Sequence, residues 1–248
     1  MLEIGGIRIL TDPLLRDRVS LLRRHAPPVT LAATEPVDAV LVSHLHLDHL
    51  DLGSLRMVPG TPRLFVPRGG GRLLRRWGFD DVVELTLSDR AEFGSVSIEA
   101  VPAFHVGHRP PAGPRAESLG FVVESDEHRV WFAGDTDVFL GMANLRAIDL
   151  ALLPVWGWGP RLGSGHLDPR RAAESLALVQ PTLAIPIHWG TYWPIGLSWY
   201  RSRLLVDPPH ALRSEAVVLA PDVEVRILEP GEITMLGPRR PVEQDSAR

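Results

Sequence analysis

A run of metal-binding side chains directly follows an apolar segment near the start of the chain. Residues 37–42 are typical of a buried strand, and the next seven residues read Ser-His-Leu-His-Leu-Asp-His. His44 and His46 are two positions apart, so on extended backbone they point the same way and can hold one ion together. Asp48 and His49 follow once the chain has turned, and can face a second position. The motif therefore predicts a rigid strand ending in a site for one or two divalent transition metals. A histidine-rich polar loop is the alternative, but four such ligands seldom gather without a metal.

The whole chain has the size and composition of one large α/β domain. It has 248 residues, of which 45% are hydrophobic, and this is enough for one sizeable core. No apolar stretch reaches the roughly 18 residues of a membrane span, and the N-terminus lacks the pattern of a signal peptide. We therefore expect no integral membrane segment and a cytoplasmic protein. The absence of cysteine excludes thiolate zinc sites and disulfides, and a net charge of −4 gives no electrostatic case for a nucleic-acid partner.

Strand-like segments alternate with turn signals along most of the chain. Residues 1–10 read as a short strand pair around a Gly-Gly turn. Two apolar segments joined by Ser-Asp-Glu-His predict a hairpin. The strands expected after residue 42 cover 63–66, 82–85, 96–101, 119–124, 129–133, 150–155, 183–187, 223–228 and 233–236.

Helices are expected mainly in the second half of the chain. One covers residues 168–179, because Asp168 is a good N-cap, Pro169 occupies the first helical position and Pro181 ends the segment. A short helix near 72–77 and a last helix at about 209–219 complete the set. We expect one domain over residues 1–237 and a polar C-terminal tail over 238–248.

Three further candidate ligands each stand just past an apolar strand segment. They are His105, Asp135 and His188, with glycine or small residues alongside that let the backbone approach closely. Each alone could be an ordinary polar residue, but together with the histidine-rich motif they supply the ligands that a dinuclear site needs. His108 is an alternative to His105, which we prefer because it is nearer the strand end.

The order of these motifs resembles the metallo-β-lactamase superfamily, whose loops carry H-x-H-x-D-H, a lone His, a lone Asp and a late His. The resemblance covers nearly the whole chain and includes Thr11-Asp12-Pro13, which matches the family's early structural Asp motif. It implies an α/β fold, the four-layer αβ/βα sandwich, with two mixed β-sheets flanked by helices. It also implies a first metal bound by His44, His46 and His105, a second bound by Asp48, His49 and His188, and Asp135 bridging both.

The C-terminal half narrows the resemblance to one branch of the superfamily. Residues 165–169 (Gly-His-Leu-Asp-Pro), a helix, and residues 185–192 (Ile-Pro-Ile-His-Trp-Gly-Thr-Tyr) resemble the branch that contains L-ascorbate-6-phosphate lactonase and N-acylphosphatidylethanolamine phospholipase D. The resemblance implies a metal-dependent hydrolase of ester-type bonds, a phosphodiesterase or lactonase, whose nucleophile is a water bridging two metal ions. The ions are zinc by preference, with manganese or iron as alternatives, and the substrate is a small-molecule or lipid ester.

Two residues are candidates for proton transfer. Asp48, beside the water, would orient it and accept its proton. His166, in a glycine-rich loop before a helix, is a candidate general acid or leaving-group contact, with a simple capping contact as the alternative. Aromatic residues on two loops, Trp156, Trp158, Trp189, Tyr192 and Trp193, could wall a pocket or pack in the core. A homo-oligomer is left open, and so is a second class of function, a non-hydrolytic redox or sensor protein of the same fold.

Overall fold

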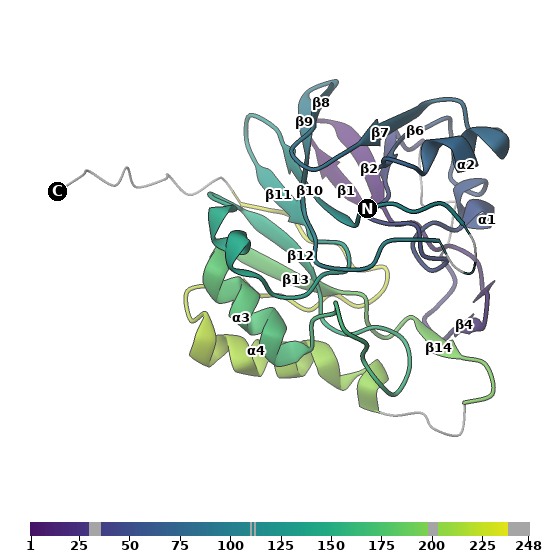
Figure 1. Ribbon diagram of the computed structural model, residues 1–248. Helices are drawn as coiled ribbons and strands as arrows, with labels where there is room; N and C mark the ends of the chain where they lie inside the picture. Colours follow the sequence, from purple (N-terminus) through teal and green to yellow (C-terminus); the bar gives the residue numbers. More distant parts are fainter. Residues whose placement is uncertain (30–35, 110, 112, 198–202, 238–248) are drawn as a thin grey trace.

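The computed structural model describes residues 1–29, 36–109, 111, 113–197 and 203–237 (Figure 1). The predicted tail at 238–248 lies outside the described residues. Within the described part, no helix has the length and apolar character needed to cross a bilayer.

The N-terminal part of the chain forms a mixed five-stranded sheet in the order β1-β2-β5-β6-β7. Its strands are β1 (Leu2–Ile4), β2 (Ile7–Thr11), β5 (Ala39–Leu41), β6 (Arg63–Pro67) and β7 (Val82–Leu85). β1 and β2 pair antiparallel across Gly5 and Gly6, as predicted, and both glycines have positive φ. β2, β5, β6 and β7 are parallel to one another. The loop that follows β5 therefore leaves the sheet at the carboxyl ends of its neighbours.

The rest of the chain forms a mixed seven-stranded sheet in the order β15-β13-β12-β11-β10-β9-β8. Its strands are β8 (Arg90–Phe93), β9 (Val96–Pro102), β10 (Leu119–Glu124), β11 (Arg129–Phe132), β12 (Leu150–Pro154), β13 (Leu183–Ile187) and β15 (Glu224–Val225). β10 and β11 form the predicted hairpin. β11, β12 and β13 run parallel, and β9 points the same way because both β9 and β11 are antiparallel to β10.

The two sheets face each other and helices cover their outer sides (Figure 1). Leu41 and Phe65 of the first sheet share a buried cluster with Phe121 and Phe132 of the second. On the far side of the first sheet, a second cluster packs under α1 (Leu52–Leu55) and α2 (Gly71–Arg76). A third cluster lies between the seven-stranded sheet and α3 (Pro169–Val179) and α4 (Asp207–Leu219). The predicted four-layer sandwich is confirmed.

Strand periodicity explains why each sheet is apolar on both faces. In β5, Leu41 faces the other sheet while Val40 belongs to the cluster under α1 and α2. In β11, Phe132 faces the other sheet while Trp131 packs toward α3 and α4. Successive side chains point to opposite faces, so a strand buried on both sides reads as a continuous apolar run.

The start of α3 follows the predicted capping pattern. The Asp168 carboxylate accepts a hydrogen bond from the backbone N–H of Arg171 at 2.9 Å, and Pro169 is the first helical residue. The helix ends at Gln180, whose φ of 50° is left-handed, directly before Pro181. The N-terminal cap at Asp168 fixes the point where the glycine-rich loop of His166 joins the helix.

The predicted strands near the C-terminus are only partly present. The expected strand at 223–228 shortens to β15, and residues 233–236 form no strand, so that prediction was wrong. Leu228 and Leu236 pack on the cluster between the sheets, whereas Ile233 and Met235 are exposed. The sequence also did not predict a small third sheet, β14-β4-β3, made of β3 (Arg18–Val19), β4 (Leu22–Arg24) and β14 (Tyr192–Pro194). Two 3₁₀ turns, η2 (Leu140–Asn144) and η4 (Arg203–Leu205), complete the structure.

Candidate metal centre

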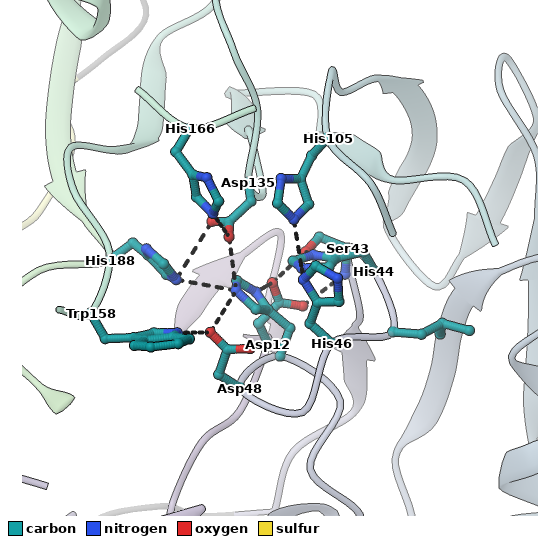
Figure 2. Close-up of polar contacts among 12 residues, drawn as sticks. Asp12, Ser43, His44, His46, Asp48, His105, Asp135, Trp158, His166 and His188 are labelled. Atoms are coloured by element: carbon teal, nitrogen blue, oxygen red, sulfur yellow. Dashed lines mark hydrogen bonds and ion pairs between the residues drawn. The ribbon is translucent and has the colours of Figure 1, made fainter. Parts of the chain in front are cut away.

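All seven side chains that the sequence predicts as metal ligands converge at one edge of the sandwich (Figure 2). They come from loops that follow β5 in the first sheet and β9, β11 and β13 in the second. The carboxyl ends of these strands meet where the two sheets adjoin. The convergent residues are His44, His46, Asp48, His49, His105, Asp135 and His188.

The first group consists of three histidines. The Nε2 of His44 lies 3.0 Å from the Nδ1 of His46, and the Nε2 of His105 lies 3.2 Å from the same Nδ1. These nitrogens are close enough to share one cation. The exposed side chain of His108 stays further away, with its ring centre 6.1 Å from that of His46. The structure thus brings His105, and not His108, into the group.

The second group consists of Asp48, His49 and His188. The Nε2 atoms of the two histidines are 3.1 Å apart, and an oxygen of Asp48 lies 3.8 Å from the Nε2 of His49. These three side chains could also hold one ion. His188 has a φ of 62°, a region that residues with a side chain rarely adopt. Backbone strain of this kind concentrates at functional sites.

Asp135 lies beside these histidines and is only 2% exposed. Its Oδ2 is 3.2 Å from the Nε2 of His49, and its Oδ1 is 3.5 Å from the Nε2 of His188. That Oδ1 is buried and has no hydrogen-bond partner among the described residues. Burial would raise the pKa of Asp135, but the positive charges of His188 and His49 hold the pKa well below its usual range. A buried, ionised carboxylate with an unused oxygen is what a bound cation would satisfy.

Backbone carbonyls fix the tautomers of two histidines. The Nδ1 of His188 is 2.9 Å from the carbonyl oxygen of Trp156, and the Nδ1 of His105 is 2.9 Å from that of Gly165. A carbonyl oxygen only accepts, so each Nδ1 must be the donor. In the neutral ring, the Nε2 then carries a lone pair directed into the cluster. This arrangement is typical of histidines that bind metals.

Asp12, which follows β2 in the first sheet, fixes two more histidines. Its Oδ2 lies 2.6 Å from the Nδ1 of His49, and it accepts a hydrogen bond from the hydroxyl of Ser43 at 2.5 Å. The Ser43 oxygen is in turn 3.0 Å from the Nδ1 of His44, from which it can accept. The resemblance pointed to Asp12 only as a structural residue. Its position shows a more specific role, because it orients His49 directly and His44 through Ser43.

In their neutral forms His44, His105 and His188 therefore direct an Nε2 lone pair into the cluster. The facing nitrogens lie 3.0–3.2 Å apart, close enough to share a cation. Burial lowers the pKa of His44 and lowers that of His105 to about 4, which keeps both rings neutral. Burial also disfavours a charged His49, yet Asp135, Asp12 and Asp48 raise its pKa well above the ordinary value. The donor set therefore fits divalent cations that prefer imidazole and carboxylate.

A glycine allows the two sheets to bring these loops together. Gly134, next to Asp135, has a φ of 61°, and a Cβ there would lie 2.6 Å from the Cβ of Ser43. Any side chain at this position would push the β5 loop away from the β11 loop. The small residue beside Asp135 thus has the close-approach role that the sequence predicts.

His166 also reaches the cluster. Its Nε2 lies 3.4 Å from Oδ2 of Asp135, and its Nδ1 lies 3.2 Å from the carbonyl oxygen of Gly163. Burial works against a charged ring, but the contact with Asp135 raises the pKa of His166. The structure therefore places His166 at the centre itself, together with a local capping contact to Gly163.

Trp158 is a site residue whose contact the sequence did not reveal. Its indole N–H donates to Oδ2 of Asp48 at 2.8 Å, although 47% of the residue is exposed. The sequence placed Trp158 only among aromatics that could wall a pocket. The available signal was its position between two glycines on a loop after a strand. Trp193, by contrast, is fully buried and packs in the interior.

A fully buried threonine ties the Asp135 loop to the His105 loop. The hydroxyl of Thr136 accepts a hydrogen bond from the backbone N–H of Phe104 at 2.8 Å and donates to the carbonyl of Asp137 at 2.9 Å. The N–H of Asp137 donates to the carbonyl of Phe104 at 3.1 Å. These bonds fix the spacing between Asp135 and His105.

We expect Thr136→Val to weaken metal binding by about tenfold or more, the usual cost of losing an outer hydrogen-bond partner at a metal site. Valine keeps the shape but leaves the Phe104 N–H unpaired, whereas Thr136→Ser retains the hydroxyl and should bind metal nearly normally. Competition with a coloured chelator measures the affinity of each variant. Equal affinities in the valine and serine variants would show that the hydroxyl does not position the centre.

Comparison with known proteins places the chain in a family. A family model described as "Beta-lactamase superfamily domain" matches residues 7–189. The chain is 33% identical to a "UPF0173 metal-dependent hydrolase" of Deinococcus radiodurans, with 95% of this chain and 94% of that protein covered. It is 31% identical to "N-acyl-phosphatidylethanolamine-hydrolyzing phospholipase D 1" of Caenorhabditis elegans, over 81% of this chain and 63% of that protein.

Some relatives are considerably longer than this chain. It spans 56% of the length of a Mycobacterium tuberculosis protein, Rv0906, to which it is 34% identical over 77% of its own length. Among solved structures, Igni18, a metallo hydrolase from Ignicoccus hospitalis, is similar with a TM-score of 0.70 at 22% identity, over 93% of this chain and 91% of that one. This likeness supports the fold alone. The matched domain and the relatives of equal length confirm the predicted family: the chain belongs to the β-lactamase superfamily.

Proposed function

We propose that this protein is a metal-dependent hydrolase of ester-type bonds, either phosphodiesters or lactones. The observation that carries the proposal is the set of inward-facing imidazole nitrogens around the unused oxygen of Asp135. Relatives of equal length named as metal-dependent hydrolases support it. The phospholipase relative, which hydrolyses a phosphodiester by its name, agrees with the first of the two bond types.

In this proposal two divalent ions occupy the two groups of ligands, with zinc preferred and manganese or iron as alternatives. His44, His46 and His105 would hold the first ion, and Asp48, His49 and His188 would hold the second. Asp135, which lies beside His49, His188 and His105, would be shared between them. Bound there, such ions would lower the pKa of a bridging water and stabilise negative charge on the substrate oxygens. The protein supplies the rigid loops that keep the donors in place.

Asp48 would orient the attacking water and accept its proton. Its Oδ2, which faces His49, accepts a hydrogen bond from the Trp158 indole at 2.8 Å, and this contact holds the carboxylate in position. His166 stands on the other side of the cluster, against Asp135, with 23% of its side chain exposed. From there it can reach a substrate that enters from solvent and donate a hydrogen bond or a proton to the leaving oxygen.

Metal analysis combined with a substrate panel tests the proposal. We expect the purified protein to contain about two zinc or manganese ions per chain, and to hydrolyse bis(p-nitrophenyl) phosphate or a simple lactone. Iron together with oxygen reduction would instead support the redox alternative. Two bound ions without turnover of any phosphodiester or lactone would contradict the hydrolase proposal.

A further inference from the structure

A cavity of about 370 Å³ opens directly beside the candidate metal centre. It shares one residue with the centre, His105. The Nε2 of His105 lies 3.2 Å from the Nδ1 of His46. Among the described residues, no acidic side chain lines it. The lining residues are His105, Val106, Gly107, His108, Arg115 and Ala116.

One wall of the cavity is tied to the loop that carries the histidine-rich motif. The Arg109 guanidinium donates to the carbonyls of Leu45 and Leu50 at 3.2 and 2.6 Å. The N–H of Leu45 donates to the carbonyl of Gly107 at 3.0 Å. These bonds hold residues 105–109 at a fixed position against the metal-binding loop, so the cavity and the centre form one rigid unit.

Two glycines pack closely against the segment of residues 115–118 that forms the other wall. A Cβ on Gly107 would lie 2.6 Å from the hydroxyl oxygen of Ser118 and 3.1 Å from the carbonyl oxygen of Ala116. Gly69, with a φ of 102°, packs so closely that a Cβ there would lie 2.5 Å from the carbonyl oxygen of Arg115. The backbone on both sides of the cavity is therefore fixed by close packing.

The cavity lining combines apolar surface with the positive charge of Arg115. Val106 and Ala116 supply aliphatic surface, and His108 and Arg115 are both exposed. In the part of the chain that the structure describes, Arg115 forms no ion pair with a carboxylate, so its planar fork of donors is available. Such a fork matches the two oxygens of a carboxylate or a phosphate group.

We propose that this cavity binds one arm of the substrate and that Arg115 selects an arm ending in an anionic oxyacid group. The proposal rests on the proposed hydrolase function. A substrate whose ester bond lies at the metal centre would extend past His105 into the cavity, with its aliphatic part against Val106 and its anion at Arg115. His108 also lines the cavity, with its ring centre 6.1 Å from that of His46, and can add a donor.

A pair of esters that differ in one charge tests the proposal. The metal-loaded protein is assayed with the monoester of 4-nitrophenol and glutaric acid, whose acyl arm ends in a carboxylate, and with neutral 4-nitrophenyl pentanoate. We expect Arg115→Gln to lower the ratio of kcat/KM for the charged over the neutral ester by about tenfold, the value of one charge-assisted hydrogen bond. Arg115→Glu should lower it further. Arg146→Gln removes the same charge from an exposed arginine outside the cavity and should leave the ratio unchanged.

A binding measurement separates failure of this proposal from failure of the proposed function. Glutarate is titrated calorimetrically into the metal-loaded wild type, Arg115→Gln and Arg146→Gln. About tenfold weaker binding to Arg115→Gln alone is the expected result. If no phosphodiester, lactone or other ester is hydrolysed, the hydrolase proposal fails while this titration still tests the cavity. An Arg115→Gln variant with wild-type glutarate affinity, or with an unchanged ratio where esters are hydrolysed, would overturn the role of Arg115.

Discussion

Asp135→Asn should reduce hydrolysis to the level of the uncatalysed reaction and leave the protein unable to hold two ions. Asparagine keeps the size of the side chain but removes the negative charge that faces His49 and His188. Its NH₂ group also cannot bind a cation, so one of the two ligand oxygens is lost. Because the position is only 2% exposed, water cannot replace the lost oxygen.

Elemental analysis and hydrolysis of bis(p-nitrophenyl) phosphate would be measured on the same preparation of Asp135→Asn. Asp222→Asn makes the same chemical change at an exposed turn and is the matched control. Near-ultraviolet circular dichroism would check that both variants keep the native packing. An Asp135→Asn variant with two ions and wild-type turnover would remove Asp135 from the centre.

Removal of the metal is the second change for which we expect a large effect. A chelator should abolish hydrolysis and lower the melting temperature by on the order of 10 °C, if the ions are present at about 1,000 times their dissociation constant. Without a cation, the converging side chains lose their common ligand, and the buried Oδ1 of Asp135 has no hydrogen-bond partner among the described residues.

Calorimetry of the stripped and the reloaded protein measures this effect. Zinc should restore both the melting temperature and activity, and magnesium should restore neither, because imidazole-rich sites favour transition metals. A stripped protein, shown by elemental analysis to be metal-free, that melts at the same temperature as the loaded protein would mean that the cluster binds no stabilising ion.

The sequence predicted the layers of the fold because local patterns decide them. Strands buried on both faces read as continuous apolar runs, as in β5 and β11, and the α3 cap at Asp168 is read from three neighbouring residues. The prediction failed at residues 233–236, where only Leu236 packs on the core and no strand in the described part of the chain pairs with the segment. The small sheet pairs β14 with β3 and β4, which lie far from it in the sequence. Strands of two or three residues are too short to give a local sequence pattern, so the sequence did not predict this pairing.

The candidate site likewise contains residues that the sequence identified and residues that only the structure revealed. The sequence identified the converging side chains by residue type and by their positions after strands. It did not identify the partners that orient them, since those depend on contacts between distant loops. Asp12 reaches His49 across 37 positions in the chain, and Trp158 reaches Asp48 across 110. Tertiary packing sets these distances, so only the structure shows them.

The division of the ligands between two sheets has a consequence for how the protein acquires its metal. Four of the donors follow β5 in the first sheet, and the other three follow strands of the second. His49 and His188, which meet at 3.1 Å, are 139 positions apart. Contacts of such long range form late, after the loop-closure entropy of the intervening chain has been overcome. The newly made chain therefore presents no complete binding site, and loading with metal must follow the docking of the two sheets.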